Sequence, residues 1–191
     1  MEKLKAEILN CKKCDLWKTR TNPVIGEGSL DADIMFVGEA PGYNEDKEGK
    51  PFIGQAGKIF DELLNSINLK REEIFITNIL KCRPLQNRNP TQEEIKACSD
   101  YLNKQIKIIK PKIICCLGNF ATDFILKKFN LKKEIQGISK IHGKVFTILT
   151  LNQSNLKIIP LYHPAVATYN MNMLETLKKD FSILQKEQGF K

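Results

Sequence analysis

The feature that most constrains the fold of this chain is a set of four short apolar runs in which hydrophobic and polar residues do not alternate. Runs of this kind, here rich in isoleucine, are typical of strands buried on both faces of a parallel sheet. They cover residues 33–37, 74–77, 112–117 and 157–161. A further run at 144–149 alternates more and predicts a strand at the edge of the sheet.

Helical stretches separate these runs. Thr91-Gln-Glu-Glu94 after Pro90 is a capping box, and it predicts a helix that ends at Pro111. Strands that alternate with helices predict an α/β fold, a three-layer α/β/α sandwich with a central four-stranded parallel sheet. We expect residues 1–191 to form this single domain. The other predicted helices cover residues 1–10, 57–67, 119–129 and a segment that begins at about Asn172.

Polar residues follow three of the four predicted central strands. Glu39 comes after the first run, Asn78 after the second, and His163, one of only two histidines, after the fourth. Ligands of open α/β sheets bind at the carboxyl edge, where these three residues would converge. An acid, an amide and an imidazole can form a reactive set, although polar residues also follow strands for purely structural reasons.

The charge and the termini of the chain restrict its partners. Thirty basic residues against 22 acidic ones give a formal net charge of +8, which favours a nucleic acid partner or reflects a lysine-rich solvated surface. No 18-residue apolar run is present, so we expect no contact with a membrane. The charged N-terminus lacks the apolar core of a signal peptide, which predicts a cytoplasmic protein with reduced cysteines.

Four of the six cysteines form two pairs that are separated in sequence. Four thiolates can surround one zinc ion or one iron–sulfur cluster, and their spacing does not distinguish the two. A redox Cys-x-x-Cys pair usually opens a helix after a strand, which is not the context predicted here. The two remaining cysteines, Cys115 and Cys116, lie in an apolar run and are expected to be core thiols. The four candidate ligands are Cys11, Cys14, Cys82 and Cys98.

The glycine-rich stretch at 37–57, VGEAPGYNEDKEGKPFIGQAG, does not have the features of a phosphate-binding loop. It lacks the G-x-G-x-x-G pattern, and Gly57-Lys58 is followed by Ile59 instead of a Ser or Thr that could hold magnesium. Its acidic residues would also repel a triphosphate. The stretch therefore needs a different explanation.

Several motifs in this order resemble those of the family-4 uracil-DNA glycosylases. The resemblance extends from about Cys11 to Asn170 and includes all four candidate cysteine ligands. It implies hydrolysis of the N-glycosidic bond of uracil in DNA, the first step of base excision repair, and a [4Fe-4S] cluster in place of zinc. The motifs are GEAPG at 38–42, Glu45-Asp46, GKPFIG at 49–54, Ala56-Gly57, Thr77-Asn78, KCRP at 81–84 and His163-Pro164.

The resemblance also implies roles in a pocket for a uracil that has been flipped out of the DNA. Asn78 would accept a hydrogen bond from uracil N3–H and donate one to O4, a pattern that cytosine inverts. Phe52 would stack on the base, and His163 would donate to O2 and stabilise the departing base. Glu45 would exclude thymine from the pocket.

The resemblance implies a role for an acidic side chain, but other uracil-glycosylase families have this side chain at a different position. Glu39 would position water or stabilise the cationic sugar. Ala40 occupies the position where other uracil-glycosylase families place an acidic residue that positions water. With Pro41, Ala40 is expected to line the base pocket.

Three basic residues close to Cys82, namely Lys81, Arg83 and Arg88, are expected to contact DNA phosphates. His142 and Tyr169 depart from the family, which often has arginine at these positions.

A related branch that traps uracil covalently has a His-containing insertion before the fourth cysteine. The segment LQNRNPTQEE contains no histidine, which argues against membership of that branch. The alternatives to an enzyme are a non-catalytic nucleic-acid-binding module with a structural four-Cys metal site, and an electron carrier. Expected partners are uracil-containing DNA and, as candidates, the replication clamp or other repair proteins; a monomer is expected.

Overall fold

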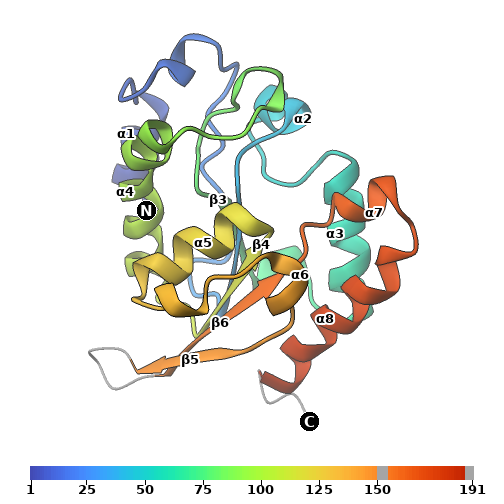
Figure 1. The fold of residues 1–191 in the computed structure, drawn as a ribbon. Helices are drawn as coiled ribbons and strands as arrows, with labels where there is room; N and C mark the ends of the chain where they lie inside the picture. Colours follow the sequence, from blue (N-terminus) through green and yellow to red (C-terminus); the bar gives the residue numbers. More distant parts are fainter. Residues whose placement is uncertain (150–154, 188–191) are drawn as a thin grey trace.

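The computed structural model describes residues 1–149 and 155–187, which form a six-stranded sheet with helices packed against it (Figure 1). The strands are β1 (Glu27–Gly28), β2 (Ile34–Gly38), β3 (Phe75–Asn78), β4 (Ile113–Leu117), β5 (Phe146–Leu149) and β6 (Asn155–Leu161). Their order in the sheet is β1-β3-β2-β4-β6-β5. The four central strands are parallel, whereas β1 and β5 pair antiparallel at the two edges.

The predicted central sheet of four parallel strands is confirmed. Each of the four non-alternating runs overlaps one central strand to within two residues at either end, and every residue of β2, β3 and β4 is buried. The run at 144–149 contains β5, the predicted edge strand, in which partly buried and exposed residues alternate. β1 was not predicted, because a two-residue strand is too short to show a periodicity.

Eight α-helices lie within the described residues, and all five predicted helices are among them. Thr91 caps the N-terminus of one of them as predicted: its hydroxyl accepts a hydrogen bond from the Glu94 N–H, and the Glu94 carboxylate accepts one from the Thr91 N–H. The helices are α1 (Glu2–Leu9), α2 (Tyr43–Glu48), α3 (Gln55–Ser66), α4 (Gln92–Ile109), α5 (Asn119–Lys128), α6 (Ile138–Ile141), α7 (Val166–Tyr169) and α8 (Met173–Glu187). No helix of the described residues is both long enough and apolar enough to cross a bilayer.

Two hydrophobic clusters cover the two faces of the sheet. On one face, Phe60 of α3 and Phe181 of α8 pack on Phe36 of β2, with ring centroids 4.9 and 5.6 Å from that of Phe36. On the other face, α4 and α5 pack around Met35, the preceding residue of β2. Because successive strand residues point to opposite faces, a strand that is covered on both sides must be apolar throughout.

Candidate active site and four-cysteine site

A cavity of about 420 Å³ opens at the carboxyl edge of the sheet. It is bounded by the segments that follow β2, β3 and β6 and by the stretch between α2 and α3. The structure places all seven residues that the sequence suggested for a base pocket around this one cavity: Glu39, Ala40, Pro41, Glu45, Phe52, Asn78 and His163. The opposite wall is formed by residues 84 and 87–89.

Asn78 is the last residue of β3, and its side chain is available to a ligand in the cavity. The residue is only 2% exposed, and within residues 1–149 and 155–187 no group hydrogen-bonds to its side-chain amide. Gly38, its neighbour across the sheet, makes room for this amide. A Cβ atom at Gly38 would lie 2.3 Å from Asn78 Oδ1 and 2.9 Å from Phe52 Cζ, so a larger residue at this position would displace both side chains.

Phe52 forms an aromatic wall of the cavity and has an unusual backbone conformation. Its φ angle is +52°, in the left-handed region that side chains with a Cβ rarely adopt. The guanidinium group of Arg71 donates a hydrogen bond to the Phe52 carbonyl and stabilises this conformation. The Phe52 ring lies nearly parallel to the imidazole of His163, with centroids 5.5 Å apart.

Glu45 connects α2 to the turn that carries Phe52. Its Oε1 atom accepts hydrogen bonds from the backbone N–H groups of Ile53 at 2.9 Å and Gly54 at 2.8 Å. Gly54 is the N-cap of α3, so the carboxylate satisfies donors at the start of that helix. The glycine-rich stretch is thus a folded wall of the cavity, held together by one of its own acidic residues.

His163 is held in one tautomer by the backbone. The N–H of Ala165 donates to Nδ1 of His163 at 3.2 Å, so Nδ1 acts as the acceptor and the ring proton resides on Nε2. Protein atoms enclose the imidazole although the residue is partly accessible, and this burial lowers the pKa of His163 to about 4, against an opposing effect of Glu45. The cavity therefore contains a neutral imidazole with an N–H to donate.

Glu39 is partly buried and has no hydrogen-bond or ion-pair partner for its carboxylate among the described residues. Burial raises the pKa of this carboxyl above its ordinary value. The Leu80 N–H donates to the Glu39 carbonyl at 3.0 Å, which fixes the backbone of Glu39 next to the end of β3. An unpaired carboxylate next to a cavity can accept a proton or orient a water molecule.

The three basic residues expected to contact DNA lie in different environments. Arg83 stacks over the exposed ring of Tyr43 at 5.1 Å. Arg88 lines the cavity and forms an ion pair with Glu94 of α4.

The structure contradicts the expectation for Lys81, which is 1% exposed and has its Nζ atom hydrogen-bonded inside the protein. Burial lowers the pKa of Lys81 to about 7, while the neighbouring Cys98 and Cys82 thiolates act in the opposite direction. A buried ammonium cannot reach a phosphate of bound DNA. The motif suggested an exposed basic loop because a local pattern does not show that Gln105, 24 positions away, packs against the lysine and helps to bury it.

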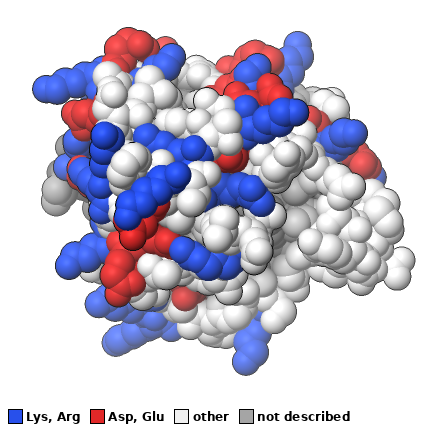
Figure 2. All heavy atoms as spheres, turned by 90° about the horizontal axis from the view of Figure 1, so that it is seen from above, with Lys and Arg blue, Asp and Glu red and all other residues white. Residues whose placement is uncertain are grey.

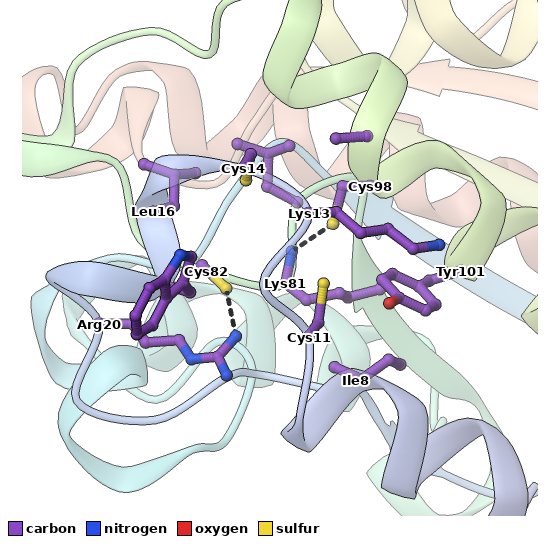
Figure 3. Close-up of a pocket in the computed structure, with 13 residues that line it drawn as sticks. Ile8, Cys11, Lys13, Cys14, Leu16, Arg20, Lys81, Cys82, Cys98 and Tyr101 are labelled. Atoms are coloured by element: carbon purple, nitrogen blue, oxygen red, sulfur yellow. Dashed lines mark hydrogen bonds between the residues drawn. The ribbon is translucent and has the colours of Figure 1, made fainter.

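A second, small pocket brings together the four candidate cysteine ligands (Figure 3). The remaining walls of this pocket are largely apolar and include Ile8, Leu16 and Leu80. Two N–H groups donate to sulfur: Arg20 to Cys82 at 3.1 Å and the Lys81 backbone to Cys98 at 3.2 Å. The four cysteines are Cys11, Cys14, Cys82 and Cys98.

The other two cysteines are core thiols, as predicted. Cys115 and Cys116 are fully buried in β4 and point to opposite faces of the sheet. Burial raises the pKa of each thiol, which disfavours the reactive thiolate.

The two residues that depart from the family pattern are also in distinct settings. His142 lies at the end of α6, where its Nδ1 is 2.8 Å from a carboxylate oxygen of the buried Asp180 and its ring packs on Tyr162. Tyr169, at the end of α7, is 91% exposed. His142 is thus paired with a buried carboxylate and only partly exposed, whereas Tyr169 offers its side chain freely to a partner.

Two residues that support these sites escaped sequence reasoning. Arg20 reaches Cys82 over 62 positions in the sequence, and Gln105 reaches Lys81 over 24. Neither belongs to a local motif, so a single sequence gives no signal for either contact.

Comparison with known proteins agrees with this geometry. The sequence model of the uracil DNA glycosylase superfamily matches residues 25–185, and the chain belongs to this superfamily. It is 48% identical over 187 residues to the type-4 uracil-DNA glycosylase of Sulfurisphaera tokodaii, an alignment that covers 97% of this chain and 84% of the relative. The enzymes of the same name from Archaeoglobus fulgidus and Saccharolobus solfataricus are 49% and 50% identical, covering 92% of this chain and 86% and 80% of theirs.

Proposed function

We infer that this protein is a uracil-DNA glycosylase that hydrolyses the N-glycosidic bond of uracil in DNA and so begins base excision repair. One observation supports this function above all: the same cavity contains the free amide of Asn78 and the neutral imidazole of His163. A base in the cavity could form hydrogen bonds to the Asn78 amide through its Watson–Crick edge. The His163 imidazole could stabilise the negative charge on the base as it leaves. The superfamily membership and the type-4 relatives point to the same activity.

We propose that Asn78 reads the base and that Phe52 stacks on it. The Asn78 carboxamide can accept from uracil N3–H and donate to O4, and cytosine presents the opposite pattern at these two positions. A base that is stacked inside the duplex cannot enter a cavity of the protein, so it would have to leave the stack to reach Asn78. Glu45, which holds the turn of Phe52, stays the residue predicted to exclude thymine.

We propose that His163 supports the departing base. When the glycosidic bond breaks, its electron pair goes to the base and negative charge develops on O2 of uracil. A neutral Nε2–H donor that is already oriented stabilises this charge without giving up its proton. Glu39, as the carboxylate, would stabilise the cationic sugar or orient the water that attacks it.

We propose that the four cysteines hold a [4Fe-4S] cluster. A single zinc ion requires four sulfurs within about 2.3 Å of one point. Among the residues that the structure describes, no group of three Cys, His, Asp or Glu side chains could hold one metal ion, whereas the four cysteines line a shared pocket. That arrangement, the apolar walls and the N–H donors to sulfur fit a cluster. The cluster would connect the segment after α1, the helix α4 and the segment after β3.

The charges around the cavity support DNA as the substrate. Figure 2 looks down on the molecule from above the view of Figure 1 and shows Lys and Arg side chains, with Asp and Glu among them, spread over one part of this face. The opposite side, where Figure 1 places α7, is an uncharged lobe, and residues 160–174 contain no Lys, Arg, Asp or Glu. Lys and Arg side chains of the charged part would contact phosphates, with Arg83 and Arg88 as candidates.

We propose further that residues 1–191 act as one domain and as a monomer inside the cell. Candidate protein partners are the replication clamp and other repair proteins. Sedimentation of the purified protein tests the oligomeric state, and an excess of dimer would contradict the monomer.

Incubation with an oligonucleotide that contains one uracil, followed by alkali, tests the activity. We expect strand cleavage at uracil and none at cytosine or thymine in the same position. Asn78→Ala should lose most of this cleavage and remain folded. Absence of cleavage by an intact protein with a full iron content would disprove the enzyme and leave a nucleic-acid-binding module.

A further inference from the structure

Lys81 lies between the two sites, with its ammonium group buried. Its Nζ atom donates hydrogen bonds to Thr77 Oγ1 at 2.6 Å, to the Asn78 carbonyl at 2.7 Å and to Gln105 Oε1 at 2.7 Å. A lysine has three N–H donors, and all three have a partner here. A buried amine with a full set of acceptors fixes the groups around it, because moving any one of them leaves a polar atom unpaired.

The acceptors of Lys81 are themselves fixed. Gln105 of α4 donates from Nε2 to the Ile25 carbonyl at 2.6 Å, and the Thr77 hydroxyl lies 3.2 Å from the same oxygen. Gln105 and Thr77 are both completely buried. The lysine therefore anchors the carbonyl of Asn78 to α4 and to the segment before β1.

The backbone of Lys81 reaches the cysteine site. Its N–H donates to Cys98 Sγ at 3.2 Å, and its carbonyl accepts from the Val24 N–H at 2.7 Å. Cys82 is the next residue along the chain. One residue thus contacts a candidate cluster ligand through its main chain and the base-reading residue through its side chain (Figure 3 shows the sulfur contact).

We propose that Lys81 is a positioning residue that couples the four-cysteine site to Asn78 and thereby sets the discrimination of uracil from other bases. This inference rests on the proposed function. The hydrogen bond to the Asn78 carbonyl fixes the peptide plane that follows Asn78, and with it the direction in which its side chain enters the cavity. Contact with Gly38 on the other side restricts the amide further. Reading of the base edge depends on this placement, because a hydrogen bond weakens steeply when its geometry is distorted.

Binding to two oligonucleotides tests the proposal. They are identical except for one nucleotide, which is 2′-fluoro-2′-deoxycytidine in one and 2′-fluoro-2′-deoxyuridine, whose glycosidic bond resists cleavage, in the other. Cytosine inverts the hydrogen-bonding pattern that Asn78 would read. The variants are Lys81→Met, which keeps the aliphatic stem but removes the donors, and Lys96→Met, which removes an exposed lysine of α4 near Cys98. Iron content, visible absorbance and thermal unfolding are measured on the same preparations.

We expect Lys81→Met to reduce the preference for the uracil analogue about tenfold, as loss of roughly one hydrogen bond to a charged group would. Its affinity for the 2′-fluoro-2′-deoxycytidine oligonucleotide and its iron content should equal those of the wild type. Lys96→Met should keep the wild-type preference. An unchanged preference in Lys81→Met would overturn the proposal, and so would a loss of iron together with the preference, because the lysine would then only support the fold.

Thr77→Val provides a milder variant if Lys81→Met does not fold. It removes one acceptor of the ammonium and touches neither the cavity nor a cysteine. A smaller loss of preference with full iron content supports the proposal, and a wild-type preference contradicts it. If the wild-type protein itself shows no preference for the uracil analogue, the proposed function is wrong, and this outcome differs from a failure of Lys81→Met alone.

Discussion

The backbone N–H of Ala165 donates a hydrogen bond to Nδ1 of His163, and this single contact determines which nitrogen of the imidazole carries the proton. The turn that begins at His163 supplies this donor two residues further along the chain. The ring proton is then on Nε2, and His163 is one of the residues that line the cavity. A histidine arranged in this way acts as a neutral hydrogen-bond donor, and it does not need to deliver a proton.

Replacement of His163 by alanine tests this role. We expect the single-turnover rate of uracil excision to fall by about 10²- to 10³-fold, as for the loss of a donor to a developing negative charge in other enzymes. Binding of the DNA should change little. His142→Asn is the matched control, because it alters the only other histidine and an asparagine can still donate to Asp180. A wild-type rate in His163→Ala would refute the assignment.

The dependence of the excision rate on pH should report Glu39. Burial raises the pKa of Glu39, so the carboxylate becomes protonated as the pH falls through a value above the ordinary 4.5. Because the carboxylate is the form proposed to act, the single-turnover rate should decrease toward acidic pH. His163, with a pKa of about 4, stays neutral over the same range.

Glu39→Gln provides the control for this profile. The variant should be slower at neutral pH, and its rate should no longer decrease as the pH is lowered to about 5. If the acidic limb persists unchanged in Glu39→Gln, another group is responsible for it.

Gly38→Ala should disrupt the base pocket without any change in a reacting group. The new Cβ atom would come within 2.3 Å of Asn78 Oδ1 and 2.9 Å of the Phe52 ring, so both side chains must move. We expect loss of selective binding to the uracil analogue, measured by fluorescence anisotropy. Gly137→Ala is the control, since its Cβ would meet only Ser139 Oγ at 3.9 Å. Equal selectivity of the two variants would contradict the proposed crowding at Gly38.

The cysteines differ in what their removal should do. Cys98→Ala should lose bound iron and visible absorbance and lower the melting temperature, because α4 would no longer be tied to the segment after β3. Cys116→Ala should keep its iron, since this thiol packs in the sheet core. Iron retained at the wild-type level in Cys98→Ala would remove Cys98 from the ligand set.

The sequence by itself determined the central sheet, the order of the main helices and the edge at which the site forms. These features depend on periodicity and on the residues that follow each strand, which are local properties of the chain. Glu39, Asn78 and His163 could therefore be assigned to one sheet edge before their contacts were known. The short elements α2, α6 and α7 could not be predicted, because four to six residues do not reveal a helical repeat.

Only the tertiary structure decided the environment of each charged side chain. Lys81 reads in the sequence as one more basic residue of an exposed loop, yet Thr77 and Gln105 surround its ammonium group. Likewise, Glu45 looks like a solvated acid but holds the turn of Phe52. The physical reason is the same in both cases: whether a charge is solvated or paired depends on how the folded backbone directs the side chain and on what packs around it, and the local sequence pattern specifies neither.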